Sequence, residues 1–307
     1  MLDVAPCDRL ARASGVARPV VQWLWRTTEV GSMLSANACP GGVMEITDLS
    51  DRYLSTYLMC LEDWSAEMQE AGDLKARWYE KMRDRGLRVK LALDDQQRAV
   101  GMIQYLPIEQ SMAEGQDLYM VLCIWVHGYG EGVGKQQGRG IGTALLAAAE
   151  QDVQALGAKG LAAWGVTLPF WMRASWFKNH GYETADRSKG RELVWKRFTD
   201  DVEAPTWLAP GADPEPVDGQ VTITAFSSGW CPAVNLVYER ARRVAEELGE
   251  PVVFVPFDTS EPAAMRLHGQ SDVVFLDTKP LQRGAPPSYD AIKKRVSKRV
   301  RRLQRRH

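Results

Sequence analysis

The stretch QGRGIGTALL, residues 137–146, joins an apolar segment to an alanine-rich one. Its glycines at 138, 140 and 142 let the backbone approach an anion closely, because no Cβ is in the way. A helix that begins at Ile141 would add N-terminal amides and partial positive charge. Arg139 and Thr143 can add side-chain donors. The stretch therefore predicts a pyrophosphate-binding loop, with a structural turn that holds no ligand as the alternative.

Two other phosphate-binding loops do not fit these residues. A Walker loop requires GxxxxGK[ST], but Gly134 and Lys135 are followed by Gln136. A dinucleotide-binding loop requires GxGxxG, whereas this run is GxGxG and follows a series of predicted strands rather than a βαβ unit.

Hydrophobic patterning outward from the loop predicts an α/β domain in which strands dominate the early part. A helix over 141–156, ending before Gly157, would connect two neighbouring strands. The expected strands cover 44–49, 88–93, 98–105, 119–126 and 160–166 and a pair that ends at 198; the other expected helices cover 52–62, 74–83 and 171–180.

The pattern QxxGxG between a strand and a helix, on this strand order, resembles motif A of the GNAT superfamily of N-acetyltransferases. Gln137, Gly140 and Gly142 match it directly, and residues 171–182 resemble that fold's later helix and closing corner. The resemblance covers residues 44–198. It implies an α+β fold with a mixed central sheet, and acetyl-CoA as the donor, with no metal. The donor-binding residues that it implies are Cys123, Ile124, Trp125, Val126, Gln137, Gly138, Arg139, Gly140, Ile141, Gly142, Thr143 and Asn179.

The same resemblance implies direct attack of an acceptor amine on the thioester, which needs a base, oxyanion donors and an acid. Many members place a tyrosine four residues before the closing glycine, where this chain has Phe177. Ser175, Tyr182 and water remain as proton donors. The base candidates at the ends of strand 119–126 are Asp117, Tyr119 and His127. The structural alternative for Asp117 is a turn residue, and the structural alternative for His127 is a solvent-facing strand end.

The eleven tryptophans admit two interpretations. Most are expected to pack in the core. Two or three of those in residues 44–198 could instead line an acceptor pocket for an apolar or cationic substrate. Cys123, inside an apolar strand, is expected to be a core residue rather than a nucleophile.

Residues 220–307 predict a second, smaller α/β domain. Trp230-Cys231-Pro232 at a helix start resembles the thioredoxin/glutaredoxin fold, and the helix N-terminus is expected to lower the pKa of Cys231. Val234 stands where a second cysteine would lie, and Ser271-Asp272 stands where that fold usually has a cis-proline. Thiol chemistry and a structural or acceptor-handling role both remain open. The two halves together resemble the YoaP-like acetyltransferases, over residues 44 to about 296.

The net charge of −1 conceals a division of the 307 residues. Residues 199–219 hold six acidic residues, no basic one and four prolines, and so predict an extended linker. Residues 220–307 sum to +6, with nine Lys or Arg in 292–307. This basic end predicts a terminal helix with a solvated face; contact with RNA or anionic lipid is the alternative. Residues 1–43 are interpreted as an extension or the result of an upstream start codon.

No apolar run approaches the ~20 residues of a membrane helix. The five cysteines are odd in number and scattered, which predicts reduced thiols and a cytoplasmic protein. The leading hypothesis is an acetyl-CoA-dependent N-acyltransferase that acts on a small-molecule or peptide amine, with no membrane partner and no general affinity for nucleic acid. The alternative is a thiol-based binding or redox module in which Cys231 acts and the acetyltransferase fold senses CoA.

Overall fold

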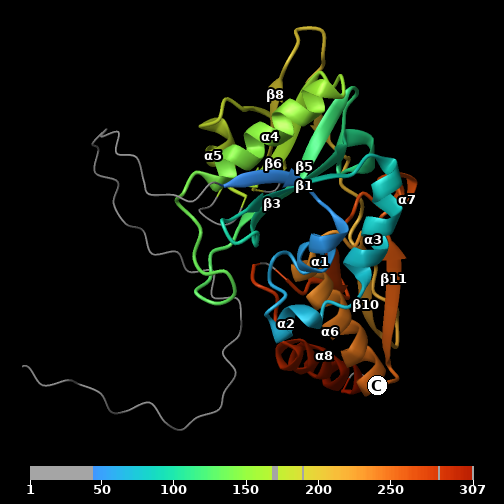
Figure 1. Cartoon of the computed structure of the whole chain (residues 1–307). Coiled ribbons are helices and arrows are strands. Elements are labelled where there is room, and N and C mark those ends of the chain that lie inside the picture. The colour runs from blue at the N-terminus through green and yellow to red at the C-terminus, as the bar shows by residue number, and fades with distance from the viewer. Residues whose placement is uncertain (1–43, 168–171, 189, 283, 306–307) are drawn as a thin grey trace, which may run out of the picture.

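The computed structural model describes residues 44–167, 172–188, 190–282 and 284–305, and the extension expected over 1–43 lies outside them. Its larger sheet has the strand order β1-β2-β3-β5-β6-β8-β7 (Figure 1). These strands are β1 (Glu45–Asp48), β2 (Arg88–Leu93), β3 (Ala99–Pro107), β5 (Leu118–Val126), β6 (Gly160–Val166), β7 (Glu183–Ser188) and β8 (Arg191–Arg197).

The larger sheet is mixed, as the resemblance to the GNAT fold implies. Strands β5 and β6 run parallel, whereas the other neighbouring pairs run antiparallel. Helix α4 (Ile141–Ala155) connects β5 to β6 and buries Ile141, Leu145 and Val153 against one face of the sheet. Helix α5 (Ala174–Lys178) packs on the same face. Its expected first residue, Trp171, lies outside the described residues.

The opposite face is covered by α1 (Leu54–Leu58) and α3 (Leu74–Met82), with the short α2 (Ala66–Gln69) beside them. The continuous helix expected over 52–62 is wrong. The chain leaves α1 after Leu58, and Cys60 and Leu61 take left-handed backbone angles, with φ of +51° and +65°. Tertiary packing overrides helix propensity here, since Leu61 is buried in the core below the sheet.

The acidic linker contains a short strand, β9 (Thr206–Trp207), that pairs with β4 (Ala113–Glu114). The Trp207 backbone amide donates to Asp186 Oδ2 at 2.9 Å, and the guanidinium of Arg191 lies 5.1 Å from the centre of the Trp207 ring. The linker is thus held against the larger sheet through its tryptophan.

The smaller sheet has the order β11-β10-β12-β13, in which β10 and β11 are parallel and the other pairs antiparallel. Helices α6 and α8 cover one face, and His268 of α7 lies against Phe226 and Phe257 of the sheet. The elements are β10 (Val221–Ser227), α6 (Pro232–Leu248), β11 (Val252–Asp258), α7 (Pro262–His268), β12 (Val273–Leu276), β13 (Lys279–Pro280) and α8 (Tyr289–Gln304).

The basic terminal helix is anchored rather than detached. Ile292, Val296 and Leu303 of α8 are buried, as their helical spacing predicts. Two of its basic residues form ion pairs within the same part of the chain, Lys293 with Glu247 and Arg299 with Asp277.

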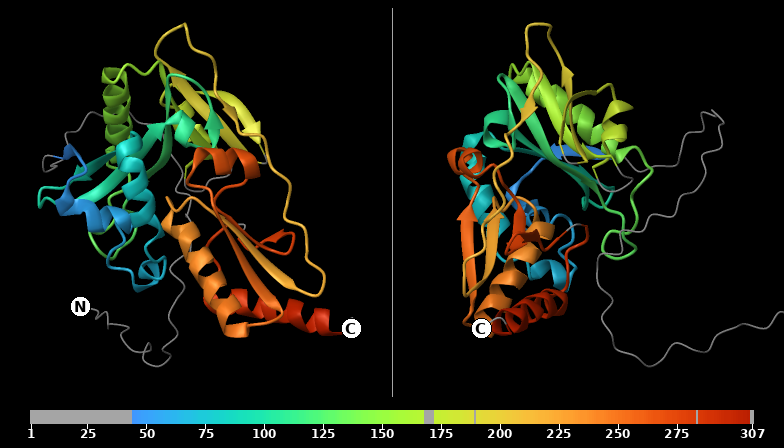
Figure 2. Two further views of the ribbon diagram at one scale, coloured as in Figure 1. Left: turned by 90° about the vertical axis from the view of Figure 1, so that its right-hand side faces the viewer. Right: turned by 180° about the vertical axis from the view of Figure 1, so that it is seen from behind.

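The two sheets are joined by a helical layer, in which α2 and α3 lie beside α6 (Figures 1 and 2). Trp230, just before α6, is buried in the core below the larger sheet together with Trp78. In the same layer, Arg240 of α6 pairs with Glu67 and Glu70. The start of α6 therefore lies against the larger sheet, on the face opposite α4.

Candidate active site

The parallel strands β5 and β6 separate halfway along their length. Their register runs from Leu118 opposite Gly160 to Val121 opposite Ala163, but β5 continues to Val126 and β6 to Val166. At the point of separation the pairing of β5 with β3 shifts by one residue, a β-bulge of the kind common beside active sites. The Trp164 indole donates to the Leu122 carbonyl at 2.9 Å near the start of the opening.

A cleft of about 570 Å³ opens where the strands part, a size typical of ligand pockets. The end of β5, the loop before α4 and the region of α5 form its walls. The lining residues are Ile124, Trp125, Val126, Gln137, Gly138, Gly140, Ile141, Gly142, Thr143, Met172, Arg173, Ser175, Trp176, Phe177 and Asn179.

Two glycines shape the entry to α4. Gly138 and Gly140 have φ of +80° and +76°, a region that side-chain-bearing residues rarely adopt. A Cβ on either would meet no atom within 4 Å, so both face open space. The first amides of a fifteen-residue helix therefore face the cleft, and the helix dipole favours an anion there.

The predicted donor-binding residues all line this cleft except Cys123 and Arg139. Side chains alternate along β5, so Cys123 projects to the opposite face of the sheet and lines a different pocket. Arg139 donates to the side-chain oxygen of Gln136. Contact of these residues with a bound donor remains a prediction.

His180 was not singled out by the sequence, but it supports the helix start. Its Nδ1–H donates to the Trp176 carbonyl at 2.8 Å, so Nε2 accepts from the Thr143 hydroxyl at 2.9 Å. The His180 and Trp176 rings lie 4.2 Å apart. The hydrogen bond between His180 and Thr143 links the region of α5 to the first turn of α4. In the sequence, the only sign of this arrangement is that Trp176 and His180 are four residues apart.

The three predicted base candidates do not meet at the cleft. Asp117 and Tyr119 lie at the other end of β5. At about 3.3 Å per residue they are roughly 23 and 17 Å from Ile124, where the cleft lining begins. Asp117, with φ of +57°, forms an ion pair with Lys159 at 3.3 Å. The ring of Tyr119 packs edge-on against Tyr105.

His127, the third candidate, is fully buried and not a solvent-facing strand end. Its Nε2 accepts from the Trp64 indole at 3.2 Å, so Nδ1–H donates to the Gly134 carbonyl at 2.8 Å. Burial lowers the pKa of His127 below its ordinary value. Both nitrogens are engaged in a neutral ring, so the geometry favours none of the three candidates as a base.

The proton-donor candidates are divided between cleft and core. Ser175 lines the cleft, and Phe177 is also part of its wall. Tyr182 is buried against Phe177, with ring centres 5.5 Å apart, and burial raises its pKa well above the ordinary value. Ser175 is therefore the side-chain candidate of this group that lines the cleft with a hydroxyl.

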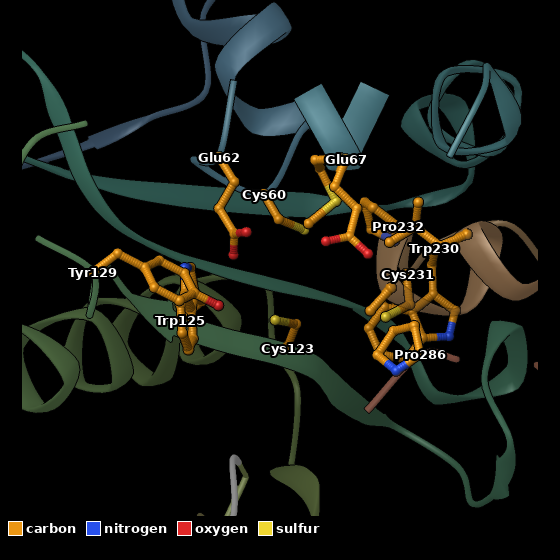
Figure 3. Close-up of a pocket in the computed structure, with 13 residues that line it drawn as sticks. Cys60, Glu62, Glu67, Cys123, Trp125, Tyr129, Trp230, Cys231, Pro232 and Pro286 are labelled. Carbon is orange, nitrogen blue, oxygen red and sulfur yellow. The ribbon is translucent and has the colours of Figure 1, made fainter. Parts of the chain in front are cut away.

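A second pocket, of about 80 Å³, lies on the opposite face of β5 (Figure 3). The chain from α1 to α2, strand β5 and the start of α6 enclose it. Its lining residues are Cys60, Glu62, Glu67, Met68, Cys123, Trp125, Tyr129, Trp230, Cys231, Pro232, Ala233, Leu236 and Pro286. We call it the interdomain pocket, a name that refers only to its place between the larger sheet and the start of α6.

Cys231 lines the interdomain pocket, but the expected lowering of its pKa is wrong. Burial raises the pKa of Cys231 to about 12, although the Val234 and Ala233 amides at the helix start act in the opposite direction. Burial also raises the pKa values of Cys60 and Cys123. In the part of the chain that the structure describes, these three thiols are free of disulfides and belong to no cluster that could hold a metal.

Glu62 is the residue of this pocket that sequence reasoning missed. Its side chain is 5% exposed, and burial, with Glu67 nearby, raises its pKa to about 7. As the last residue of the helix predicted over 52–62, Glu62 has the pattern of an ordinary polar residue on the helix surface. No local pattern signals its burial.

Residues 46–182 match the model of the acetyltransferase (GNAT) family. The chain therefore contains a GNAT acetyltransferase domain, and this domain carries the cleft between β5 and α4. No curated protein matches the chain. Among the described residues, no helix is long and apolar enough to cross a membrane.

Several solved structures are similar to part of the chain. One is a GNAT family N-acetyltransferase (YhbS) from Escherichia coli in complex with CoA, with 17% identity, 54% of this chain and 87% of that chain covered, and a TM-score of 0.39. A GNAT family acetyltransferase from Brucella melitensis in complex with acetyl-CoA has 14% identity, with 54% and 97% covered and a TM-score of 0.39. An aminoglycoside 6'-acetyltransferase type Ii has 18% identity, with 50% and 97% covered and a TM-score of 0.39.

Proposed function

We propose that this protein is an acetyl-CoA-dependent N-acyltransferase that passes an acetyl group to an amine by direct attack on the thioester. The observation that carries the proposal is the glycine-capped start of α4, which faces the cleft where β5 and β6 part. The GNAT match of residues 46–182 supports the same reaction class.

The residues of the cleft suit the two ends of such a donor. Open space beyond Gly138 and Gly140 leaves room for a pyrophosphate on the amides of the first turn. The segment Ile124–Val126 at the cleft wall offers the backbone edge of β5 to the pantetheine arm. Ser175 is the proposed proton donor to the leaving thiolate, in place of the tyrosine that Phe177 replaces.

We further propose the domain limits 44–198 for the acetyltransferase part, 199–219 for the linker and 220–307 for a thioredoxin-like domain. The order β10–α6–β11–α7–β12–β13–α8, with Cys231 at the start of α6, supports the last of these. The free thiols of Cys60, Cys123 and Cys231 agree with a reducing cytoplasm. Thiol chemistry at Cys231 remains the alternative function, but a pKa near 12 leaves little thiolate at neutral pH.

The test is acetyl-CoA binding to the full chain by calorimetry, with Gly140→Glu and Gly157→Glu as a matched pair. Both glycines have positive φ and open space, and they flank opposite ends of α4. Both variants therefore carry the same added charge and backbone strain. A carboxylate at 140 would repel a pyrophosphate, whereas one at 157 would be distant from it.

We expect Gly140→Glu to weaken acetyl-CoA binding at least tenfold, about 1.4 kcal/mol, and Gly157→Glu to bind like the wild type. Absence of binding to the wild type, or equal affinities for all three proteins, would contradict the proposal.

A further inference from the structure

We propose that the interdomain pocket is the acceptor site, that Glu62 is its general base, and that the acceptor is a small primary amine with an apolar body. This inference rests on the acetyl transfer proposed above. It also gives the C-terminal part of the chain a role, because Trp230, Cys231 and Pro232 form one wall of the pocket.

The pocket and the donor cleft lie on opposite faces of the same strand. Side chains alternate along β5, so Ile124 and Val126 face α4, whereas Cys123 and Trp125 face the interdomain pocket. Trp125 belongs to the lining of both spaces. The register of β5 with β6 ends at Val121, just before these residues. An acetyl group in the cleft can therefore meet an amine from the other face at this opening in the sheet.

Glu62 is placed as a base would be. Figure 3 shows its carboxyl group pointing into the pocket, toward the space between Tyr129 and Cys123. Among the described residues, its buried Oε2 has no hydrogen-bond partner. A buried carboxyl oxygen without a partner is costly to maintain, so it indicates a missing ligand group that can donate.

The backbone before Glu62 is strained in a way that fixes this orientation. Cys60 and Leu61 both take left-handed backbone angles, with φ of +51° and +65°, a conformation that residues with a side chain rarely adopt. Lys75 stabilises this turn, because its Nζ donates hydrogen bonds to the Tyr57 carbonyl at 2.6 Å and to Cys60 Sγ at 3.2 Å. Strain of this kind is concentrated at functional sites.

The electrostatic surroundings suit a base that works near neutral pH. Burial is the larger cause of the raised pKa of Glu62, and the Glu67 charge is the second. Glu67 is itself held by Arg240 at 2.7 Å. The titratable groups around Glu62, from each wall of the pocket, are Cys60 and Glu67, Cys123 of β5, Tyr129 after β5 and Cys231 at the start of α6, with Lys75 behind Cys60.

The lining also defines the acceptor class. Two carboxyl groups favour an ammonium group, and the rings of Trp125 and Tyr129, with centres 6.0 Å apart, offer it π faces. Met68, Trp230 and Leu236 supply an apolar wall for the rest of the molecule. A volume of about 80 Å³ holds roughly half a dozen water-sized groups. Anionic acceptors would be repelled by Glu62 and Glu67.

The proposed reaction balances without any further reagent. The ammonium of the acceptor gives one proton to the Glu62 carboxylate, and its nitrogen forms a bond to the acetyl carbonyl carbon. The carbon–sulfur bond of the thioester then breaks. The Ser175 hydroxyl gives its proton to the thiolate and takes the second nitrogen proton in its place, and Glu62 releases its proton to solvent. The products are the N-acetyl amine, CoA thiol and one proton.

The test compares the full chain with Glu62→Gln and with Glu183→Gln, an exposed glutamate at the start of β7. Release of CoA thiol is followed from pH 5.5 to 9 with n-butylamine and isobutylamine, and with L-glutamate as the anionic comparison. Acetyl-CoA binding is measured on the same samples by calorimetry.

We expect n-butylamine to be acetylated and L-glutamate not to be. Glu62→Gln should lower kcat/KM about 100-fold or more and remove the rise in rate near pH 7, while its acetyl-CoA affinity equals that of the wild type. Glu183→Gln should match the wild type in every measurement. A second variant, Trp230→Ala, should shift the preference from n-butylamine toward the bulkier benzylamine.

Failure of this inference differs from failure of the proposed function. If acetyl-CoA binds but Glu62→Gln keeps the rate and pH profile of the wild type, Glu62 is not the base. If acetyl-CoA binds but neither alkylamine releases thiol above the buffer control, the acceptor class is wrong. An unchanged amine preference in Trp230→Ala would remove the C-terminal wall from the site. Absence of acetyl-CoA binding would overturn the proposed function itself.

Discussion

Cys231 illustrates, at the scale of one residue, a competition between burial and a helix terminus. The helix dipole and amides contribute about 1 kcal/mol toward the thiolate. Burial can raise a thiol pKa by several units, because the charged form loses its hydration. The structure puts Cys231 in an apolar pocket beside Trp230 and Pro232, so burial is the larger effect.

The chemical consequence is slow alkylation of Cys231. With a pKa near 12, only about one Cys231 side chain in 10⁴ to 10⁵ is a thiolate at pH 7.5. For an ordinary thiol the fraction at this pH is about one in ten. We expect iodoacetamide to modify Cys231 at least 100-fold more slowly in the folded chain than in urea, with a rate that still rises above pH 9. Mass spectrometry of the Cys231 peptide gives both rates, and equal rates would contradict the prediction.

At the scale of elements, the loop before α6 depends on one carboxylate from another strand end. Asp272, just before β12, accepts hydrogen bonds from the Ser228 amide at 3.1 Å, the Ser228 hydroxyl at 2.8 Å and the Trp230 indole at 3.0 Å. Its φ of +55° turns it toward the loop. Asp272 occupies the place where the sequence lacks the expected proline, and it positions Trp230.

Removal of this carboxylate should release the loop. Asp272→Ala would leave these three donors, and also the Ser271 hydroxyl, without the carboxylate that accepts from them, so we expect a loss of about 1–3 kcal/mol in the free energy of unfolding, measured in urea. Asp213→Ala, an exposed change in the linker, is the control and should stay within about 0.5 kcal/mol of the wild type. Equal stabilities of the two variants would show that Asp272 does not hold the loop.

At the scale of the whole molecule, Arg240 joins the two sheets through the helical layer. Its side chain is 4% exposed and contacts Glu67 at 2.7 Å, Glu70 at 3.1 Å and the Pro287 carbonyl at 3.1 Å. Loss of a buried guanidinium is costly because Glu67, which is largely buried, is left with an uncompensated charge, although Glu70 keeps its ion pair with Arg243.

We expect Arg240→Ala to lower the free energy of unfolding by about 3–5 kcal/mol and to separate the urea transition into two. Arg242→Ala is the matched control. Arg242 pairs with Glu239 and Glu246 of its own helix and is more exposed, so its loss should cost about 1 kcal/mol or less. A single transition of unchanged midpoint for Arg240→Ala would mean that the parts do not depend on this contact.

Local patterns in the sequence were sufficient for the main strands of the larger sheet and for the cleft beside α4, but not for α2, β4 and β9. Strands β2 and β6 match their predicted limits, and the glycines at 138 and 140 mark the start of α4 because only a residue without Cβ accepts their backbone angles easily. These features depend on neighbours in the chain. They can therefore be read from the order of residues alone.

Only the tertiary structure decided which side chains meet in the interdomain pocket. Glu62 and Trp230 are far apart in the sequence and come together because Cys60 and Leu61 turn the chain out of α1 and α6 lies beside α2 and α3. Burial at that meeting point then sets the protonation of Glu62 and Cys231. A pKa depends on what surrounds a group in space, so residue order determined the main strands and the cleft beside α4, whereas packing determined the protonation of the groups in the second pocket.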